Sequence, residues 1–358
     1  MSIVCGRAAG IDVHKKMLVV VVLDSTDPEH DVAVGRYGTT HSRLSELRAF
    51  LRARGVEQVA MESTAQYWRP VWMALEGEFA LTLAQARSTR APRGRKWDLA
   101  DARRIARRLL ADDLPVSYVP PPEQRDWRLL ARTRVAMTEM LTQIRNQIGQ
   151  VLEQAQIKLS SVVSDVLGVS GRRMLKAVIA GERDAERLAE PGRQKLHASR
   201  EELADALHGN PTVAQRLVLQ LYLDQIEKLE RDMATLEREL AAAQTAQQRA
   251  IVRLCAIPGY SARAAQQVIA EIGPCAAAFA SAGKLASWIG VCPGQQESAG
   301  ESCGARSAKG NRMLRRLFSQ IAWAAIAAKG SEAGRRYRRL LCKGAGKAAW
   351  GWLTPWSG

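Results

Sequence analysis

Residues 8–24 read AAGIDVHKKMLVVVVLD, and they decide the fold of the N-terminal part of the chain. Two apolar stretches, 8–12 and 17–23, each have the length of a strand, and Val13 to Lys16 between them are turn material. A third stretch with alternating apolar and polar residues follows over 31–37 after a short polar turn. Three strands so close together in the chain predict an antiparallel meander.

Helical and strand patterns then alternate up to residue 110. The apolar spacing predicts helices and strands in this order: a helix over 42–54, a strand over 58–61, a helix over 67–76, a strand over 80–84 and a helix over 98–110. Three antiparallel strands followed by alternating helices and strands is the order of the ribonuclease-H-like fold. We therefore predict an α/β domain of this class over residues 1–115.

The charge balance points to a polyanionic partner. The 358 residues include 52 Lys or Arg and 36 Asp or Glu, a net charge of +16. Nucleic acid is the first expectation and an anionic membrane surface the second. An apolar content of 47% excludes global disorder. The longest apolar run, Met17 to Leu23, is too short to span a membrane, and no signal-peptide pattern opens the chain, so we expect a cytoplasmic protein without membrane contact.

Two carboxylates follow predicted strands. Asp12 ends the first strand, and Glu62 ends the strand over 58–61. In a ribonuclease-H-like sheet these two strands are parallel neighbours, so the carboxylates would lie side by side, where they repel unless a cation sits between them. Taken singly, Asp12 is equally a turn residue and Glu62 a surface residue.

Two further carboxylates open the predicted helix over 98–110. Asp98 and Asp101 are three residues apart and share one helix face. Capping of the helix and a favourable first-turn charge are the alternative explanation. Together, the four carboxylates could hold two Mg²⁺ ions (or Mn²⁺) about 4 Å apart, and oxygen-only ligands favour Mg²⁺. The basic loop RSTRAPRGRK at 87–96 would supply Arg93, Arg95 and Lys96 as cations for nucleic-acid phosphates.

Two heptad-like patterns mark the middle of the chain, residues 123–250. One lies within 123–160 and is interrupted by Arg134; the other runs from Leu219 to Leu240 in steps of three and four. They predict long amphipathic helices that form an intramolecular hairpin, an intermolecular coiled coil, or both. We expect this region to link the domains and to support multimers.

Residues 251–330 are predicted to be a mainly α-helical domain. A helix, the Pro258-Gly259 turn and a second helix ending at Gly273 are similar to a helix-hairpin-helix, whose turn and helix N-terminus can hold a DNA phosphate. An ordinary helical corner is the alternative. Beyond it, 331–358 is a basic tail with an unusual Trp- and Gly-rich end.

Several motifs carry a resemblance to a known family. They are GIDVHK (10–15), AMEST (60–64), KWDLADA (96–102), IPG (257–259), FASAGKLASWIGVCPG (279–294), QQESAGES (295–302) and KGNRMLRRL (309–317). In this order they resemble the DEDD transposases, or recombinases, of the insertion-sequence one-hundred-and-ten type, which are related to pilin-gene invertases. The resemblance covers about residues 8–330.

The resemblance implies roles for particular residues. It implies an N-terminal domain similar to Holliday-junction resolvases of the RuvC type, with Asp12, Glu62, Asp98 and Asp101 as the metal-binding tetrad. It also implies a nucleophilic serine in the C-terminal domain, which matches Ser298, with Ser302 and Ser307 as rivals, and a phosphoserine intermediate. Basic residues around this serine could neutralise phosphate charge or form only a solvated face: Arg306, Lys309, Arg312, Arg315 and Arg316.

The function predicted from all of this is transposition of an insertion sequence. The family resemblance implies Mg²⁺-dependent cleavage and rejoining of double-stranded DNA of the mobile element and its target by a homo-multimer (a dimer or tetramer), guided in many members by a structured RNA. Two alternatives stay open: a structure-specific, Holliday-junction-like DNA nuclease, and a non-catalytic DNA-binding derivative. The departure of the tail from the family pattern would fit a truncated or frame-shifted copy.

Overall fold

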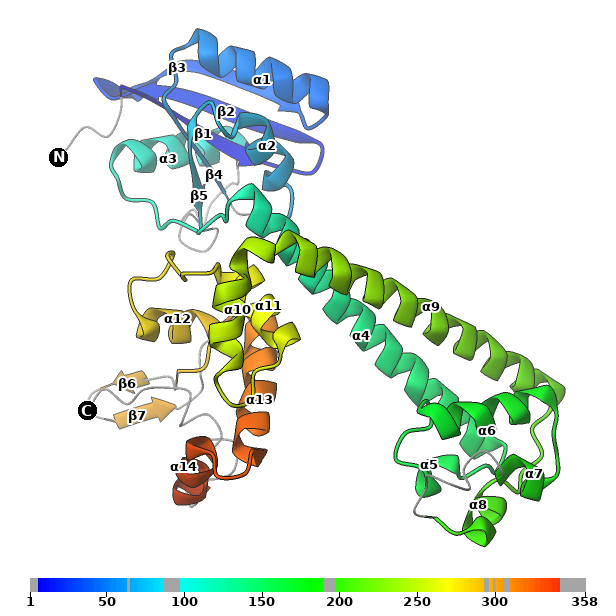
Figure 1. Cartoon of the computed structure of the whole chain (residues 1–358). Coiled ribbons are helices and arrows are strands. Elements are labelled where there is room, and N and C mark those ends of the chain that lie inside the picture. The colour runs from blue at the N-terminus through cyan, green and yellow to red at the C-terminus, as the bar shows by residue number, and fades with distance from the viewer. Residues whose placement is uncertain are drawn as a thin grey trace. The chain divides into compact units, whose positions relative to one another are not determined.

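The chain divides into two compact units, Met1–Val119 and Pro120–Gly358 (Figure 1). The computed structural model describes residues 6–62, 65–85, 97–189, 198–292, 296–298, 301–304 and 310–341. Within this described part, no helix is long and apolar enough to cross a membrane.

The first unit is built on a mixed five-stranded sheet of order β3-β2-β1-β4-β5. Its strands are β1 (Arg7–Val13), β2 (Met17–Asp24), β3 (Asp27–Gly38), β4 (Gln58–Glu62) and β5 (Ala80–Ala84). The first three strands pair antiparallel, whereas β4 pairs parallel to both β1 and β5. The predicted meander and the parallel pairing of the first and fourth strands are confirmed. This strand order and mixture of directions fit a ribonuclease-H-like domain.

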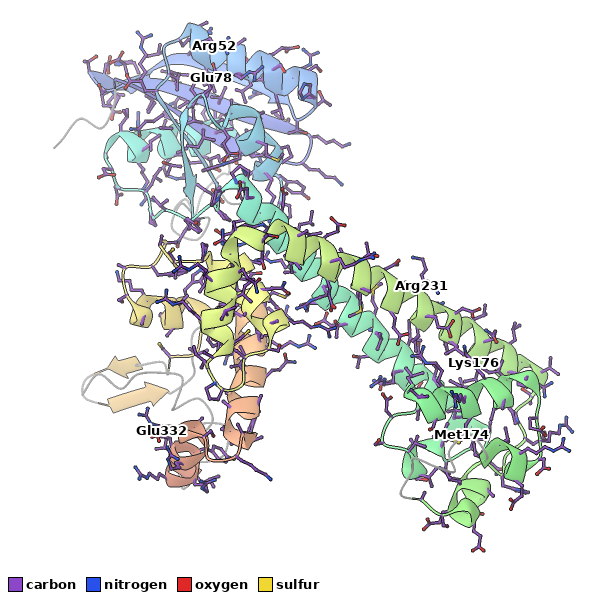
Figure 2. All side chains as sticks on the ribbon, in the orientation of Figure 1. Arg52, Glu78, Met174, Lys176, Arg231 and Glu332 are labelled. Carbon is purple, nitrogen blue, oxygen red and sulfur yellow. The ribbon has the colours of Figure 1, made fainter. Side chains whose placement is uncertain are left out.

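Helices cover both faces of this sheet. On one face, α1 (His41–Ala53) and α2 (Trp68–Leu75) pack with the odd-numbered side chains of β1 and with β4 in one hydrophobic core. Arg52 near the end of α1 pairs with Glu78 in the turn before β5, which ties these elements together (Figure 2). On the other face lies α3 (Asp98–Leu110), with Ile105 and Leu109 buried against Ala8 and Ala60.

A glycine in β1 allows α3 to approach the sheet closely. A Cβ atom added to Gly10 would lie 2.2 Å from the carbonyl oxygen of Ala102 and 2.5 Å from the backbone nitrogen of Ala106. Both atoms belong to the backbone of α3, so they cannot move aside as a flexible side chain would. The small residue is therefore required by the helix-to-strand distance at this crossing.

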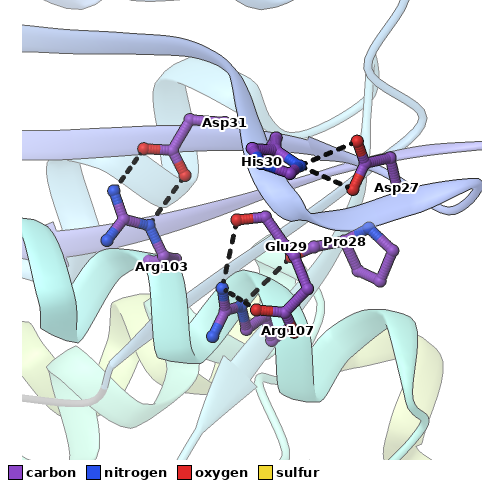
Figure 3. A network of polar contacts seen from close by, with 7 residues as sticks. All are labelled: Asp27, Pro28, Glu29, His30, Asp31, Arg103 and Arg107. Carbon is purple, nitrogen blue, oxygen red and sulfur yellow. Dashed lines mark hydrogen bonds and ion pairs between the residues drawn. The ribbon is translucent and has the colours of Figure 1, made fainter.

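Arginines on α3 tie the helix to the edge strand β3 (Figure 3). Arg103 forms a two-pronged pair with the carboxylate of Asp31. Arg107 donates to Oε2 of Glu29 at 2.8 Å and to the carbonyl oxygen of Pro28 at 3.1 Å. Bidentate pairs of this kind fix orientation as well as distance. They hold the helix at its position across the sheet.

The second unit begins with a helical hairpin. The long helices α4 (Pro122–Gln154) and α9 (Val213–Ala243) lie side by side. At one end their apolar side chains share a core with four short helices: α5 (Leu159–Val162), α6 (Val169–Ala180), α7 (Ala185–Ala189) and α8 (Arg200–Ala206). Met174 of α6 is fully buried there, and Lys176 pairs with Glu227 of α9 at 2.8 Å. The intramolecular hairpin is confirmed.

The rest of the second unit is a mainly helical group. It contains η2 (Thr245–Gln247), α10 (Gln248–Cys255), α11 (Ala262–Ile272), α12 (Ala282–Ile289), β6 (Gln296–Ser298), β7 (Glu301–Gly304), α13 (Arg312–Ala327) and α14 (Glu332–Leu340). Its central polar contact is Glu271 of α11, whose fully buried carboxylate accepts two hydrogen bonds from Arg132 of α4 at 2.7 and 2.8 Å. The Asn311 amide, which also caps α13, donates to it at 3.2 Å.

Several details differ from the sequence predictions. Strand β3 starts at Asp27, four residues before the predicted stretch, because it continues the hairpin from β2 through the expected turn. Helix α4 ends at Gln154, and Gln156 beyond it has a left-handed φ of 64°. The antiparallel hairpin of β6 and β7 was not predicted, since its strands have only three and four residues.

Replacement of Gly10 by alanine tests the close approach of α3. We expect Gly10→Ala to lower the free energy of unfolding of the first unit by about 2 kcal/mol, because the new methyl group overpacks against the helix backbone. Hydrogen exchange of β1 and α3 amides measures this loss locally. Gly149→Ala in α4 is the control, since nothing lies within 4 Å of its added Cβ and alanine favours helix. Unchanged protection in Gly10→Ala would contradict the close packing.

Candidate metal centre

The period-two alternation of the strands places two carboxylates on the face that α3 covers. In β1, the side chain of Ala8 packs against α3, whereas those of Ala9 and Ile11 pack on the opposite face. By the same alternation, Asp12 lies on the face that α3 covers. In β4, Ala60 packs against α3 and Met61 packs on the opposite face, so Glu62 also lies on the face that α3 covers. Because Ile11 is in register with Met61 in the parallel pair, both carboxylates lie at the same edge of the sheet.

The first turn of α3 brings the other two carboxylates. Trp97 is the N-cap and Asp98 is the first helical residue, and no side chain caps this helix in the described part of the chain. The alternative explanation of Asp98 as the N-cap is therefore wrong. Asp101 lies one turn further on and accepts a hydrogen bond from Arg104 at 2.7 Å.

A histidine joins two of these carboxylates. Nε2 of His14 lies 3.2 Å from Oδ2 of Asp12 and 3.3 Å from Oδ1 of Asp98. One candidate ligand atom from each of the three residues lies within 4.8 Å of the other two. His14 follows the end of β1, and its backbone N–H donates to the carbonyl oxygen of Met17 at 2.9 Å, which closes the turn into β2. Among the described residues, this is the group whose spacing suits a metal ion.

The charge environment of Asp12 includes the other three predicted carboxylates. Burial is the largest cause that raises the pKa of Asp12, whose side chain is 9% exposed. The imidazole of His14 lowers this pKa, while the charges of Asp98, Asp101 and Glu62 raise it further. The net shift is upward, so the ionised form of Asp12 is disfavoured in the protein alone.

The residues present fit a divalent cation. Oδ2 of Asp12 and Nε2 of His14 are buried and form no hydrogen bond with any group in the described part of the chain. Buried polar atoms normally find a partner, and these two lie close to each other and to an oxygen of Asp98. A cation there would satisfy both atoms and offset the repulsion among the carboxylates.

Not every predicted site residue is placed. Arg93, Arg95, Lys96, Arg306, Lys309 and Ser307 lie outside the described residues. Ser298 and Ser302 lie in β6 and β7, but their side chains are not among those described. Arg312 is exposed at the start of α13, Arg316 pairs with Glu139 of α4, and Arg315 also has a partner.

Arg134, which interrupts the first heptad pattern, lies at a cavity of about 400 Å³ in the second unit. Arg134 lines it with a side chain that is 9% exposed, and burial holds the pKa of this guanidinium below its ordinary value. It donates to Oε1 of Gln267 at 3.2 Å and lies 3.9 Å from Glu237. The charged residue thus sits among polar groups of α9 and α11.

Sequence reasoning missed His14. It treated Val13 to Lys16 as turn material, although His14 stands two residues after Asp12. The same alternation that places Asp12 on the α3 side places the next-but-one residue there as well. The Asp-x-His spacing after a buried strand was the signal that could have found it.

Two family models match the chain. One, for DEDD transposases of the IS110 type, matches residues 9–157, and the other, described as the transposase IS116/IS110/IS902 family, matches residues 252–338. The chain belongs to the IS110-type DEDD transposase family. This transposase is accordingly an enzyme that cuts DNA in transposition. The first match spans Asp12, Glu62, Asp98 and Asp101.

The other comparisons add little for this transposase. No curated protein matches it. Among solved structures, T. thermophilus RuvC in complex with Holliday junction substrate is similar at 14% identity over 32% of this chain and 100% of that chain, with a TM-score of 0.24. The ribonuclease-H-like assignment therefore rests on the sheet order and strand directions themselves.

The raised pKa of Asp12 gives a test of the site's electrostatics. A carboxyl with a raised pKa binds its proton more strongly in the folded chain, so stability falls as pH rises from about 3.8 through the raised pKa. In the absence of divalent ions at pH 7, we expect Asp12→Asn to melt roughly 2–4 °C higher than the wild type. Scanning calorimetry in EDTA between pH 4 and 8 should show this difference shrink towards pH 4.

Asp24→Asn is the matched control with the opposite sign. Hydrogen bonds from Thr26 and from Arg7 lower the pKa of Asp24 to about 2, so its ionised form stabilises the fold above pH 3.8. Its replacement should lower the melting temperature at pH 7. An Asp12→Asn variant that also melts lower in EDTA at pH 7 would contradict the electrostatic account.

Proposed function

We propose that this chain cleaves DNA strands during excision and insertion of a mobile element, with Asp12, Glu62, Asp98 and Asp101 holding two Mg²⁺ or Mn²⁺ ions. The observation that carries the proposal concerns Oδ2 of Asp12. This atom lies close to Asp98, is buried, and accepts no hydrogen bond from the described residues. The charges of Glu62 and Asp101 act on the same carboxyl group. The family membership supports DNA as the substrate.

Each carboxylate has a distinct place in this scheme. Asp12 and Glu62 come from neighbouring strand ends, and Asp98 and Asp101 come from the helix that crosses them. Divalent ions, when bound, activate the attacking water or hydroxyl and stabilise the leaving oxygen. The protein supplies a fixed set of oxygen atoms, since β1, β4 and α3 are packed in one layered unit. The ion pair with Arg104 orients the carboxylate of Asp101, one helical turn after Asp98.

Binding of double-stranded DNA is supported by the net charge of +16. Arg93, Arg95 and Lys96 directly precede Asp98 in sequence, and Arg312 is exposed, so these residues are proposed to contact phosphates. Arg306, Lys309, Arg315 and Arg316 are proposed to contribute to the same contacts. For the Pro258-Gly259 turn, a phosphate contact of the helix-hairpin-helix kind is likewise a proposal.

We also propose a guide RNA, a multimer and a division of the chain into four regions. A guide RNA is supported by the family resemblance alone. A dimer or tetramer is supported by the heptad pattern of α9, whose central positions Leu229, Met233 and Leu236 are only half-buried within one chain. The proposed limits are 1–115, 123–250, 251–330 and 331–358.

The phosphoserine intermediate expected from the sequence is not supported. In the proposed scheme the carboxylate site would cleave DNA through a metal-activated water or hydroxyl, without a covalent protein–DNA bond, in keeping with membership of a DEDD family. Ser298 therefore takes no part in the proposed scheme. A denaturing-gel assay of Ser298→Ala addresses this point: an adduct with DNA that is lost in the variant would restore the serine step, and cleavage without an adduct in both proteins would exclude it.

The proposed function predicts a metal-dependent nuclease activity that needs the carboxylates. Nicking of supercoiled and branched DNA with Mn²⁺ or Mg²⁺ should fall about a hundredfold or more in Asp12→Asn and in Glu62→Gln, since charge stabilisation in the transition state is lost. Asp113→Asn, an exposed carboxylate of the same unit, should cut as the wild type does. DNA binding that is retained by every protein without any metal-dependent cleavage would contradict the proposal.

A further inference from the structure

We propose that His14 is a nitrogen ligand of the metal centre, and that the centre therefore prefers Mn²⁺ or a related transition-metal ion over Mg²⁺. This inference rests on the proposed function, because it concerns the same site. It changes the donor set from oxygen alone to oxygen and nitrogen.

The placement of the imidazole carries the inference. Nε2 stands between carboxylate oxygens of two different elements, 3.2 Å from Asp12 at the end of β1 and 3.3 Å from Asp98 at the start of α3. All three ligand atoms lie within 4.8 Å of one another, so they can face one ion. The residue is held there by its backbone bond to Met17, which fixes the turn that follows β1.

An imidazolium that only neutralises the two carboxylates is the alternative. Such a group would donate its Nε2 proton to one of the oxygens that flank it. In the described part of the chain, Nε2 of His14 and Oδ2 of Asp12 both remain without a hydrogen bond, although they are 3.2 Å apart. Two buried polar atoms that lie close without a hydrogen bond need a partner, and an ion bound by both would satisfy them.

The donor set decides the ion. Mg²⁺ takes oxygen ligands almost exclusively and gives up its water reluctantly. Imidazole is a common ligand of transition metals such as zinc, iron and nickel but not of Mg²⁺, whereas carboxylates suit Mn²⁺ as well as Mg²⁺. A site with one histidine and up to four carboxylates therefore prefers Mn²⁺ over Mg²⁺ more strongly than the same site without the histidine.

Pulsed electron paramagnetic resonance of Mn²⁺ bound to the full-length chain tests the inference directly. We expect a nitrogen coupling typical of imidazole in the wild type, and its loss in His14→Gln together with a Mn²⁺ affinity about tenfold weaker or more. Mg²⁺ affinity, measured by competition, should change less. His30→Gln is the control, because His30 is an exposed histidine on β3 whose ring pairs with Asp27.

Two further variants keep the outcomes separate. His14→Asn serves as a second substitution, and either variant counts only if its circular dichroism spectrum matches the wild type. A nitrogen coupling and a Mn²⁺ affinity that both survive loss of His14 overturn its assignment as a ligand. Asp12→Asn distinguishes this result from failure of the proposed function: if Asp12→Asn binds Mn²⁺ as tightly as the wild type, the carboxylate site itself is wrong.

Discussion

The close approach of α3 to β1 at Gly10 is the constraint on which the site depends. With no side chain at this position, the backbone of Ala102 and Ala106 lies against the strand. Two residues further along β1 stands Asp12, and one turn before Ala102 stands Asp98. The distance between a strand-borne and a helix-borne carboxylate is thus set by the packing of two backbones, which is stiffer than a contact between long side chains.

The same geometry places like charges together at a cost. Burial and three neighbouring carboxylates disfavour the ionised form of Asp12, and the imidazole of His14 offsets only part of this effect. Elsewhere in the unit, carboxylates are paired with arginines, as Asp31 is with Arg103. Like charges held close together, in a unit whose other carboxylates are paired, are typical of a functional site. There the free energy of unfolding is lowered by an arrangement that the chemistry needs.

Much of the first unit could be predicted from the sequence, because strand alternation and the order of elements leave few arrangements. Asp12 and Glu62 were found because parallel neighbouring strands end at one edge of a sheet. His14 was not found, since it was taken for a turn residue although the strand alternation continues through it to the α3 side. For α4 and α9, the heptad pattern predicts an apolar stripe on each helix, but it does not tell whether the partner helix belongs to the same chain or to another copy. The strands β6 and β7 are too short to carry a periodic signal.

The most direct test of the central claim is a crystal structure of the chain grown with Mn²⁺, with anomalous diffraction measured at the manganese edge. The account predicts an anomalous peak bonded to Oδ2 of Asp12 and to a carboxylate oxygen of Asp98. No peak beside Asp12, with manganese bound elsewhere on the protein, would contradict it.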